Sequence, residues 1–134
     1  MIPTVPTRPS PSAPFVLSLL LVASLLTPLQ AQAAGDAAAG RSFFSHCVAC
    51  HSTSPGVNKI GPSLAGVVGS KSAAVPGFAF SQGMKNADVT WDEASLDKFL
   101  ENPNGFVRGT KMFYRVSNPA DRANVIAYLK TLKQ

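Results

Sequence analysis

The sequence predicts an all-α domain of roughly 100 residues, in which three helices are joined by long loops. Apolar residues recur with helical spacing in three segments, and no segment alternates convincingly as a strand. Glycine and proline are dense between the first two of these segments. A small domain with so many loop residues has a weak core, and such domains usually need a disulfide, a metal or a cofactor as a staple.

The first two helices are predicted from their caps and apolar positions. Asp36 can cap a helix that runs from residue 37 to about residue 48. The segment TWDEASLDKFLEN, residues 90–102, has an apolar stripe. Its Thr90 and Glu93 have the spacing of a capping box, so we expect the second helix to begin there.

A third helix is predicted in residues 118–134. Asn118 is its expected N-cap, and a proline occupies the first helical position, where it needs no hydrogen-bond partner. Pro103 is expected to end the second helix. Residues 54–83 and 104–117 are expected to be irregular.

The N-terminal segment has the pattern of a secretory signal peptide. Arg8 precedes the apolar run FVLSLLLVASLL, and an Ala-Gln-Ala site ends at Ala33. We therefore expect a signal peptide in residues 1–33 and one domain in residues 34–134. The alternative is an uncleaved anchor, but the run is short of the roughly 20 apolar residues that a membrane-spanning helix needs.

The charge balance favours a protein partner over nucleic acid. Of the 12 basic side chains one, Arg8, falls in the predicted signal peptide, and the other 11 with 7 acidic ones give a net charge of +4. This excess is modest and lacks the dense basic stripe of a nucleic-acid-binding protein. It suits brief contact with an acidic protein surface, because complementary fields raise association rates.

The only two cysteines, Cys47 and Cys50, are followed at once by His51. A disulfide between them would close a tiny loop and stabilise little. A redox dithiol calls for a preceding strand, and a zinc site calls for more ligands than His46 can supply. The spacing is that of a c-type haem attachment site, in which two thiols bond to the haem vinyl groups and the histidine ligates the iron.

A second iron ligand has two candidates in the predicted mature chain, Met84 and Met112. Methionine by default packs in a core, where its flexible thioether fills gaps. Met112 lies in a segment expected to be a loop, which can bring its sulfur to a metal. Spacing alone favours Met112 only mildly over Met84.

Residues 35–130 resemble a class I cytochrome c, the soluble mitochondrial type and its bacterial relatives. The resemblance rests on seven segments in order: GDAAAG, CVACH, GPSLAG, PGFAFS, TWDEASLDKFLENP, GTKM and VIAYLK. It implies the cytochrome c fold, with three main helices and long loops wrapped around one covalently attached haem.

The resemblance also implies roles for single residues. Cys47 and Cys50 would form the two thioethers, with His51 as proximal and Met112 as distal iron ligand. Three further cofactor-binding positions match: Pro62, Trp91 and Thr110. The carbonyl of the proline would accept a hydrogen bond from the proximal histidine, which orients the ring and makes the ligand more basic. The tryptophan and the threonine would each donate to a haem propionate.

Other positions match the family's packing or depart from it. Gly40 would mark the place where the first helix crosses the last. Five phenylalanines are expected to line the haem pocket or the core: Phe78, Phe80, Phe99, Phe106 and Phe113. Ser70, Phe80 and Arg108 stand where relatives often have arginine, tyrosine and proline, and the first two remove donors from the propionate environment.

These expectations together predict a soluble monohaem cytochrome that transfers single electrons between redox partners in the periplasm and is not an enzyme. The alternative is a peroxidase-like or ligand-binding haem protein in which Met112 is displaced. We expect a monomer that binds no nucleic acid and has no stable membrane insertion after cleavage. Its partners would be membrane or soluble redox proteins with acidic docking surfaces, steered by Lys59, Arg108, Lys111 and Arg115.

Overall fold

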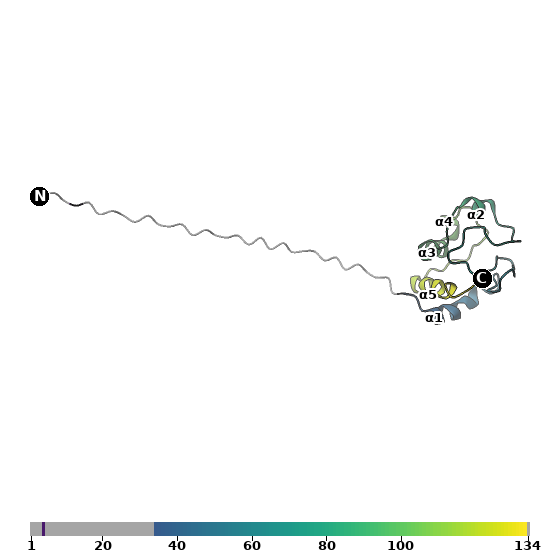
Figure 1. Ribbon diagram of the computed structural model, residues 1–134, viewed down its shortest axis with the longest axis horizontal. Coiled ribbons are helices and arrows are strands. Elements are labelled where there is room, and N and C mark those ends of the chain that lie inside the picture. The colour runs from purple at the N-terminus through teal and green to yellow at the C-terminus, as the bar shows by residue number, and fades with distance from the viewer. Residues whose placement is uncertain (1–3, 5–33, 134) are drawn as a thin grey trace. The chain divides into compact units, whose positions relative to one another are not determined.

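The computed structural model describes residue 4 and residues 34–133. The predicted signal peptide therefore lies outside the described residues. Residues 34–133 form the helices α1 (Ala37–Phe43), η1 (Phe44–His46), α2 (Gln82–Asn86), α3 (Glu93–Glu101), α4 (Pro103–Phe106) and α5 (Pro119–Leu129) (Figure 1). Within this range the only extended pairing is an isolated bridge between Lys71 and Thr90, which confirms the all-α class.

α1 begins where the sequence predicts and ends earlier. The Asp36 side chain accepts hydrogen bonds from two backbone N–H groups of the first turn, which confirms this residue as the N-cap. The α-helix ends at Phe43 rather than near residue 48, because the chain tightens into the 3₁₀ helix η1. The backbone N–H of Cys47 bonds the Phe44 carbonyl, three residues back. This tightening turns the chain just before the two cysteines.

α1 and α5 lie side by side, although they are the first and last helices of the domain (Figure 1). A Cβ atom on Gly40 would overlap the Asn124 carbonyl and would lie 3.0 Å from Tyr128 Cβ. Beside this contact the rings of Phe44 and Tyr128 are 5.3 Å apart. The close approach of the two backbones thus requires a residue without a side chain at position 40.

α3 forms as predicted, but with a different cap. The capping box consists of Asp92 and Ser95, not of Thr90 and Glu93. Thr90 is held in extended conformation by its bridge to Lys71, so the helix cannot begin there. The Ser95 backbone N–H donates to Asp92 Oδ1 at 2.7 Å, and the Ser95 hydroxyl accepts from the Asp92 N–H at 2.9 Å.

The cap of α3 predicts a pH dependence of stability. The hydrogen bonds from the backbone and side chain of Ser95 lower the pKa of Asp92. This cap therefore contributes stability above the ordinary aspartate pKa of about 4, and the contribution is lost as the pH falls through the lowered folded-state value. Asp92→Asn keeps an N-cap acceptor that does not titrate, so the free energy of unfolding should fall less steeply on acidification. Urea unfolding at several pH values checks this, and equal slopes for wild type and variant would contradict it.

Two short helices overlap the segments that were expected to be irregular. α2 begins after Ser81, whose hydroxyl accepts the Met84 backbone N–H at 3.2 Å. α3 ends before Pro103 as predicted, and the same proline then opens α4, where it is tolerated as the first helical residue. Asn102 links the two helices, because it closes α3 and caps α4.

α5 confirms its predicted start and corrects its predicted end. Asn118 is the N-cap, and the helix stops at Leu129 instead of continuing to residue 134. Arg122 of α5 is buried, and its guanidinium bonds Asp97 of α3 at 2.7 Å as well as the carbonyls of Val116 and Ser117. This one side chain ties α5 to α3 and to the preceding loop.

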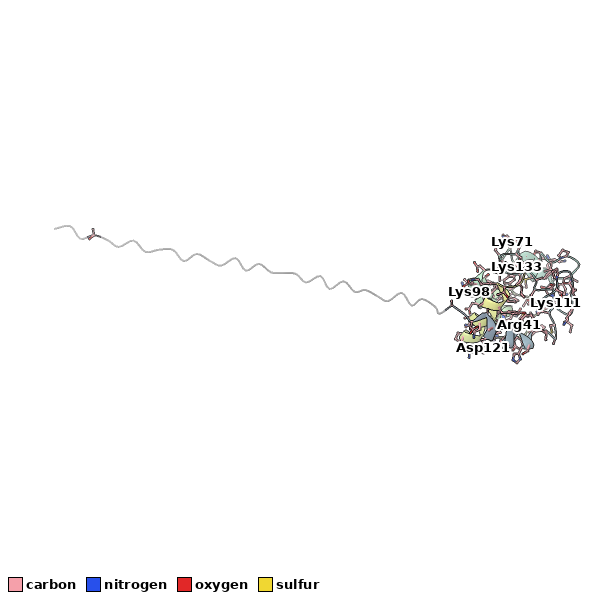
Figure 2. All side chains as sticks on the ribbon, turned by 60° about the horizontal axis from the view of Figure 1, so that its bottom comes forward. Arg41, Lys71, Lys98, Lys111, Asp121 and Lys133 are labelled. Carbon is pink, nitrogen blue, oxygen red and sulfur yellow. The ribbon has the colours of Figure 1, made fainter. Side chains whose placement is uncertain are left out.

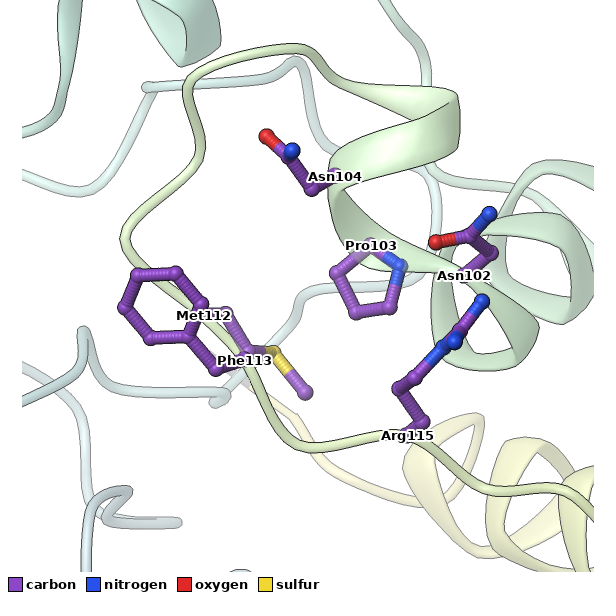
Figure 3. Close-up of a pocket in the computed structure, with 6 residues that line it drawn as sticks. All are labelled: Asn102, Pro103, Asn104, Met112, Phe113 and Arg115. Carbon is purple, nitrogen blue, oxygen red and sulfur yellow. The ribbon is translucent and has the colours of Figure 1, made fainter.

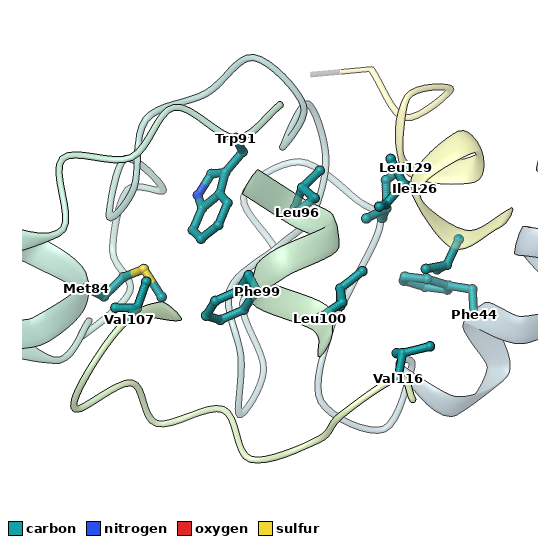
Figure 4. Packing of buried hydrophobic residues seen from close by; sticks show 11 residues of the cluster. Phe44, Met84, Trp91, Leu96, Phe99, Leu100, Val107, Val116, Ile126 and Leu129 are labelled. Atoms are coloured by element: carbon teal, nitrogen blue, oxygen red, sulfur yellow. The ribbon is translucent and has the colours of Figure 1, made fainter. Parts of the chain in front are cut away.

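A single apolar cluster joins α3, α5 and the start of η1 to the loops (Figure 4). Its buried members are Phe44, Met84, Trp91, Leu96, Phe99, Leu100, Val107, Val116, Val125, Ile126 and Leu129. Trp91 meets Phe99 edge to face with ring centroids 5.0 Å apart. Most of the chain around this core forms loops, and the residues of the candidate site lie on these loops.

Candidate functional site

The two cysteines lie on a helical turn that follows η1. The backbone N–H groups of Cys50 and His51 both donate to the Cys47 carbonyl, at 3.1 and 2.9 Å. Both thiols are free, Cys47 half-buried and Cys50 exposed. Burial, with a smaller effect of Cys50, raises the pKa of the Cys47 thiol to about 11. The turn therefore presents two unpaired sulfurs with the histidine directly after them.

His51 is held by the carbonyl of Pro62, the contact that the family resemblance implies. Its Nδ1 lies 2.8 Å from the Pro62 oxygen, and because a carbonyl only accepts, Nδ1 must carry the proton. Burial lowers the pKa of His51, an effect opposed by the Pro62 bond and reinforced by nearby Lys59. The imidazole is thus kept neutral, and its Nε2 lone pair stays available for a metal.

Gly61 was not singled out from the sequence and proves to shape the site. A Cβ atom at this position would lie 2.5 Å from His51 Cε1 and 2.8 Å from Nδ1. The Gly61 backbone N–H also donates to the Cys50 carbonyl at 2.8 Å. This glycine therefore packs against the imidazole ring and ties it to the cysteine turn. The only hint in the sequence is that this glycine directly precedes Pro62, whose carbonyl holds the ring.

Met112 follows a tight loop between α4 and α5. Gly109 has a φ of +79°, a conformation that side chains disfavour, and its N–H donates to Asn104 Oδ1 at 2.8 Å. Thr110 is buried, and its hydroxyl accepts the Met112 N–H at 3.4 Å. Met112 itself is half-buried and packs against the core. Two short-range bonds thus fix the segment that presents this thioether.

A hollow of about 170 Å³ lies beside Met112 (Figure 3). It is lined by Asn102, Pro103, Asn104, Met112, Phe113 and Arg115. The Met112 side chain points toward Pro103, whereas the Phe113 ring points away from it (Figure 3). Phe113 lines this hollow but is 82% exposed, so the expectation that it packs in the core is wrong. Side chains of neighbouring residues in an extended segment point to opposite sides, and here the Met112 side chain points to the inner side.

Trp91 and Thr110, the two expected propionate donors, are both buried. The Trp91 indole N–H bonds no other residue that the structure describes, and its nitrogen is reachable by solvent, because residues 34–133 leave no buried side-chain nitrogen or oxygen without a partner. Ser70, which stands where relatives often have arginine, donates its hydroxyl to the Val67 carbonyl at 2.7 Å. Its hydroxyl is therefore committed to its own turn.

Met84, the other candidate ligand, lies on α2 and is buried in the core cluster. Its exposed fraction is 9%, and it packs near Val107 (Figure 4). Residues 34–133 also contain no group of three or more histidine, cysteine, aspartate and glutamate side chains such as a zinc site would need. With a zinc site excluded in this range, the candidate ligand atoms are those of a haem site, namely the two thiols, the imidazole and one thioether.

These donors fit haem c chemically. Two free thiols can form thioethers, a neutral imidazole offers Nε2, and the soft sulfur of Met112 suits iron in its reduced state. Trp91 supplies an unpaired indole N–H that can donate to a carboxylate. The arrangement defines a c-type cytochrome.

Comparison with known proteins agrees with this class. The family profile of cytochrome c matches residues 37–133. Cytochrome c2 of Rhodomicrobium vannielii is 50% identical over 111 residues, which cover 81% of this chain and 89% of the relative. Cytochrome c of Euglena viridis is 50% identical over 101 residues, covering 74% and 99%. The solved structure of cytochrome cH from Methylobacterium extorquens superposes with a TM-score of 0.68 at 46% identity, covering 72% and 99%.

The chain belongs to the cytochrome c family. It carries one covalently attached haem c and is an electron carrier, not an enzyme. The fold is the all-α cytochrome c fold that the resemblance implied.

Proposed function

We propose that this protein carries single electrons between redox partners in the periplasm, with His51 and Met112 as the two axial ligands of the haem iron. The observation that supports this proposal most is the fixed orientation and protonation of the His51 ring. Its Nδ1 is bonded to Pro62, its ring is packed on Gly61, and its Nε2 is left free beside two unpaired thiols. Such a ring is held in one orientation for a metal.

Each residue has a distinct part in this proposal. Cys47 and Cys50 would fasten the haem, which supplies the one-electron chemistry when bound. His51 and Met112 would fill both axial positions, so that no substrate reaches the metal. A methionine-histidine pair raises the reduction potential. Trp91 and Thr110 would donate to the propionates from buried positions.

The charges near these ligands support docking to an acidic surface. Four ion pairs within residues 34–133 join other cations to acids: Lys71–Asp88, Arg122–Asp97, Arg122–Glu101 and Lys130–Glu93. Three of the predicted docking cations bond backbone carbonyls instead: Lys59 to Val48, Lys111 to Ala79 and Arg115 to Glu101. A carbonyl orients an ammonium or guanidinium group without neutralising it, so their positive charge is left to act on a partner.

These cations belong to the segments that hold the ligands. Lys59 is close enough to His51 to lower its pKa, and Arg115 lines the hollow beside Met112. Lys111 directly precedes Met112. A partner attracted by these charges would therefore meet the protein near the haem site, which shortens the path of the electron.

Arg108 offers the sharpest test, because its side chain is exposed and makes no hydrogen bond or ion pair with another described residue. Arg108→Gln should slow oxidation of the reduced protein by the anion ferricyanide about threefold at low salt, with the difference vanishing at high salt. Stopped-flow absorbance measures this rate. Oxidation by a cationic cobalt complex should not slow.

Lys98→Gln is the matched control. It removes the same charge from an exposed residue of α3, which lies across the domain from Lys111 (Figure 2). Its rate with ferricyanide should stay close to that of wild type. Equal slowing by both variants would mean that net charge alone, and not a local docking surface, governs the reaction.

The proposed periplasmic location is supported by the N-terminal pattern that ends at Ala33. None of the helices in residues 34–133 is long and apolar enough to cross a membrane. N-terminal sequencing of the purified haem protein is the direct test of cleavage.

A further inference from the structure

We infer that Gly83 is a positioning residue for Met112, because its lack of a side chain lets α2 rest directly on the loop that presents the methionine sulfur. The inference depends on the proposed role of Met112 as distal iron ligand. Gly83 lies 29 positions before Met112 in the sequence, and the atoms nearest to a Cβ placed on it belong to Arg108 and Gly109.

The contact is between backbones. A Cβ atom at Gly83 would overlap the Arg108 carbonyl oxygen and would lie 3.1 Å from its carbon and 3.4 Å from the carbonyl carbon of Gly109. Contacts of a real Cβ below 3.0 Å essentially never occur, so any side chain here must move α2 or the loop. Gly83 is helical and has no positive φ, so space is the reason that glycine is needed there.

α2 is fixed by its N-cap and by one buried side chain, so it cannot easily move away from the loop. Ser81 caps its first turn, and Met84 is buried in the core. Figure 4 shows Met84 beside Val107, the residue just before Arg108. Helix and loop are thus held together at two successive positions, one by side-chain packing and one by backbone contact.

The loop in turn transmits a displacement to Met112. Between Arg108 and Met112 the chain is constrained at Gly109 by its φ of +79° and at Thr110 by a backbone bond to Val107 at 3.1 Å. Lys111 reaches back with its Nζ to the Ala79 carbonyl at 3.0 Å, just ahead of α2. A shift of the Arg108 carbonyl therefore changes where the thioether lies.

The test uses the purified haem protein and the variant Gly83→Ala. Alanine favours a helix more than glycine does, so any loss cannot come from a weaker α2. We expect the sulfur-to-iron charge-transfer band of the ferric protein to weaken. The apparent affinity for imidazole should rise about tenfold, because an external ligand binds in proportion to the fraction of molecules with Met112 detached.

Gly35→Ala is the matched control. A Cβ at Gly35 would overlap the Ala123 carbonyl in the same way, but at the contact of the domain's start with α5. This variant should lose thermal stability and keep both the charge-transfer band and the imidazole affinity of wild type. Equal changes in both variants would reduce Gly83 to a general packing role and overturn the inference.

The remaining outcomes are also decisive. Absence of the charge-transfer band from wild type would reject Met112 as ligand, and with it the proposed function. A wild-type band with unchanged spectra and affinity in Gly83→Ala would overturn the inference alone. If Gly83→Ala does not fold, Ser81→Ala removes the cap of α2 without adding an atom. It should raise imidazole affinity about threefold by the same population effect, and an unchanged affinity would overturn the inference.

Discussion

Replacing Met112 by alanine should leave the haem covalently attached while lowering the reduction potential and opening the iron to external ligands. The thioether stabilises ferrous iron, and water or hydroxide in its place favours the ferric state. We expect a fall on the order of 0.1–0.3 V, within the range of about 0.8 V over which axial ligands set haem potentials. Spectroelectrochemistry measures the potential, and cyanide or carbon monoxide titration measures access to the iron.

Met84→Leu is the control for this prediction. Met84 is 9% exposed and packs in the core cluster, where leucine has nearly the same volume. The variant should bind carbon monoxide no faster than wild type and should keep its potential. If the two variants exchanged these outcomes, Met84 would be the ligand and the assignment of Met112 would be wrong.

Gly40→Ala should destabilise the protein by about 3 kcal/mol, at the upper end of the usual cost of overpacking. The added Cβ would overlap the Asn124 carbonyl, which belongs to the backbone of α5 and cannot rotate away. In a domain of this size the loss corresponds to a fall in Tm of roughly 12–20 °C. Differential scanning calorimetry or thermal unfolding followed by circular dichroism checks it.

Ala39→Leu is the matched control for Gly40. Ala39 is the preceding residue of α1 and is exposed, so a larger side chain there meets solvent instead of α5. Exposed substitutions of this kind usually change stability by no more than about 0.5 kcal/mol. A loss in Ala39→Leu comparable to that in Gly40→Ala would show that α1 tolerates no change at all, and would remove the case for close helix contact.

Sequence reasoning located the helices wherever a local signal was sufficient. Asp36 and Asn118 cap helices because their side chains reach backbone groups two or three residues away, and such bonds depend on nothing distant. The cap of α3 was misplaced because Thr90 and Asp92 are both good caps. The choice between them was made by a bridge from Thr90 to Lys71, a residue 19 positions earlier.

The same distinction applies to the site. The cysteine turn and His51 were found because the haem motif consists of five successive residues. Gly61 and Gly83 were not assigned a role, because their importance lies in the atoms opposite them, the His51 ring and the Arg108 carbonyl. Phe113 lies outside the core because adjacent residues of a loop can face opposite ways, and composition does not reveal which one faces inward.

The pairing of α1 with α5 has a consequence for how the protein matures. The Asp36 N–H bonds the Asn124 side chain across 88 positions, so this contact cannot form until nearly all of the chain has been synthesised. Closing so large a loop also costs conformational entropy, so we expect this contact to form late in folding. Until that contact forms, the free thiols of Cys47 and Cys50 lie on a chain whose first and last helices are not yet paired. We therefore expect both cysteines to be accessible for haem attachment before α5 closes the domain against α1.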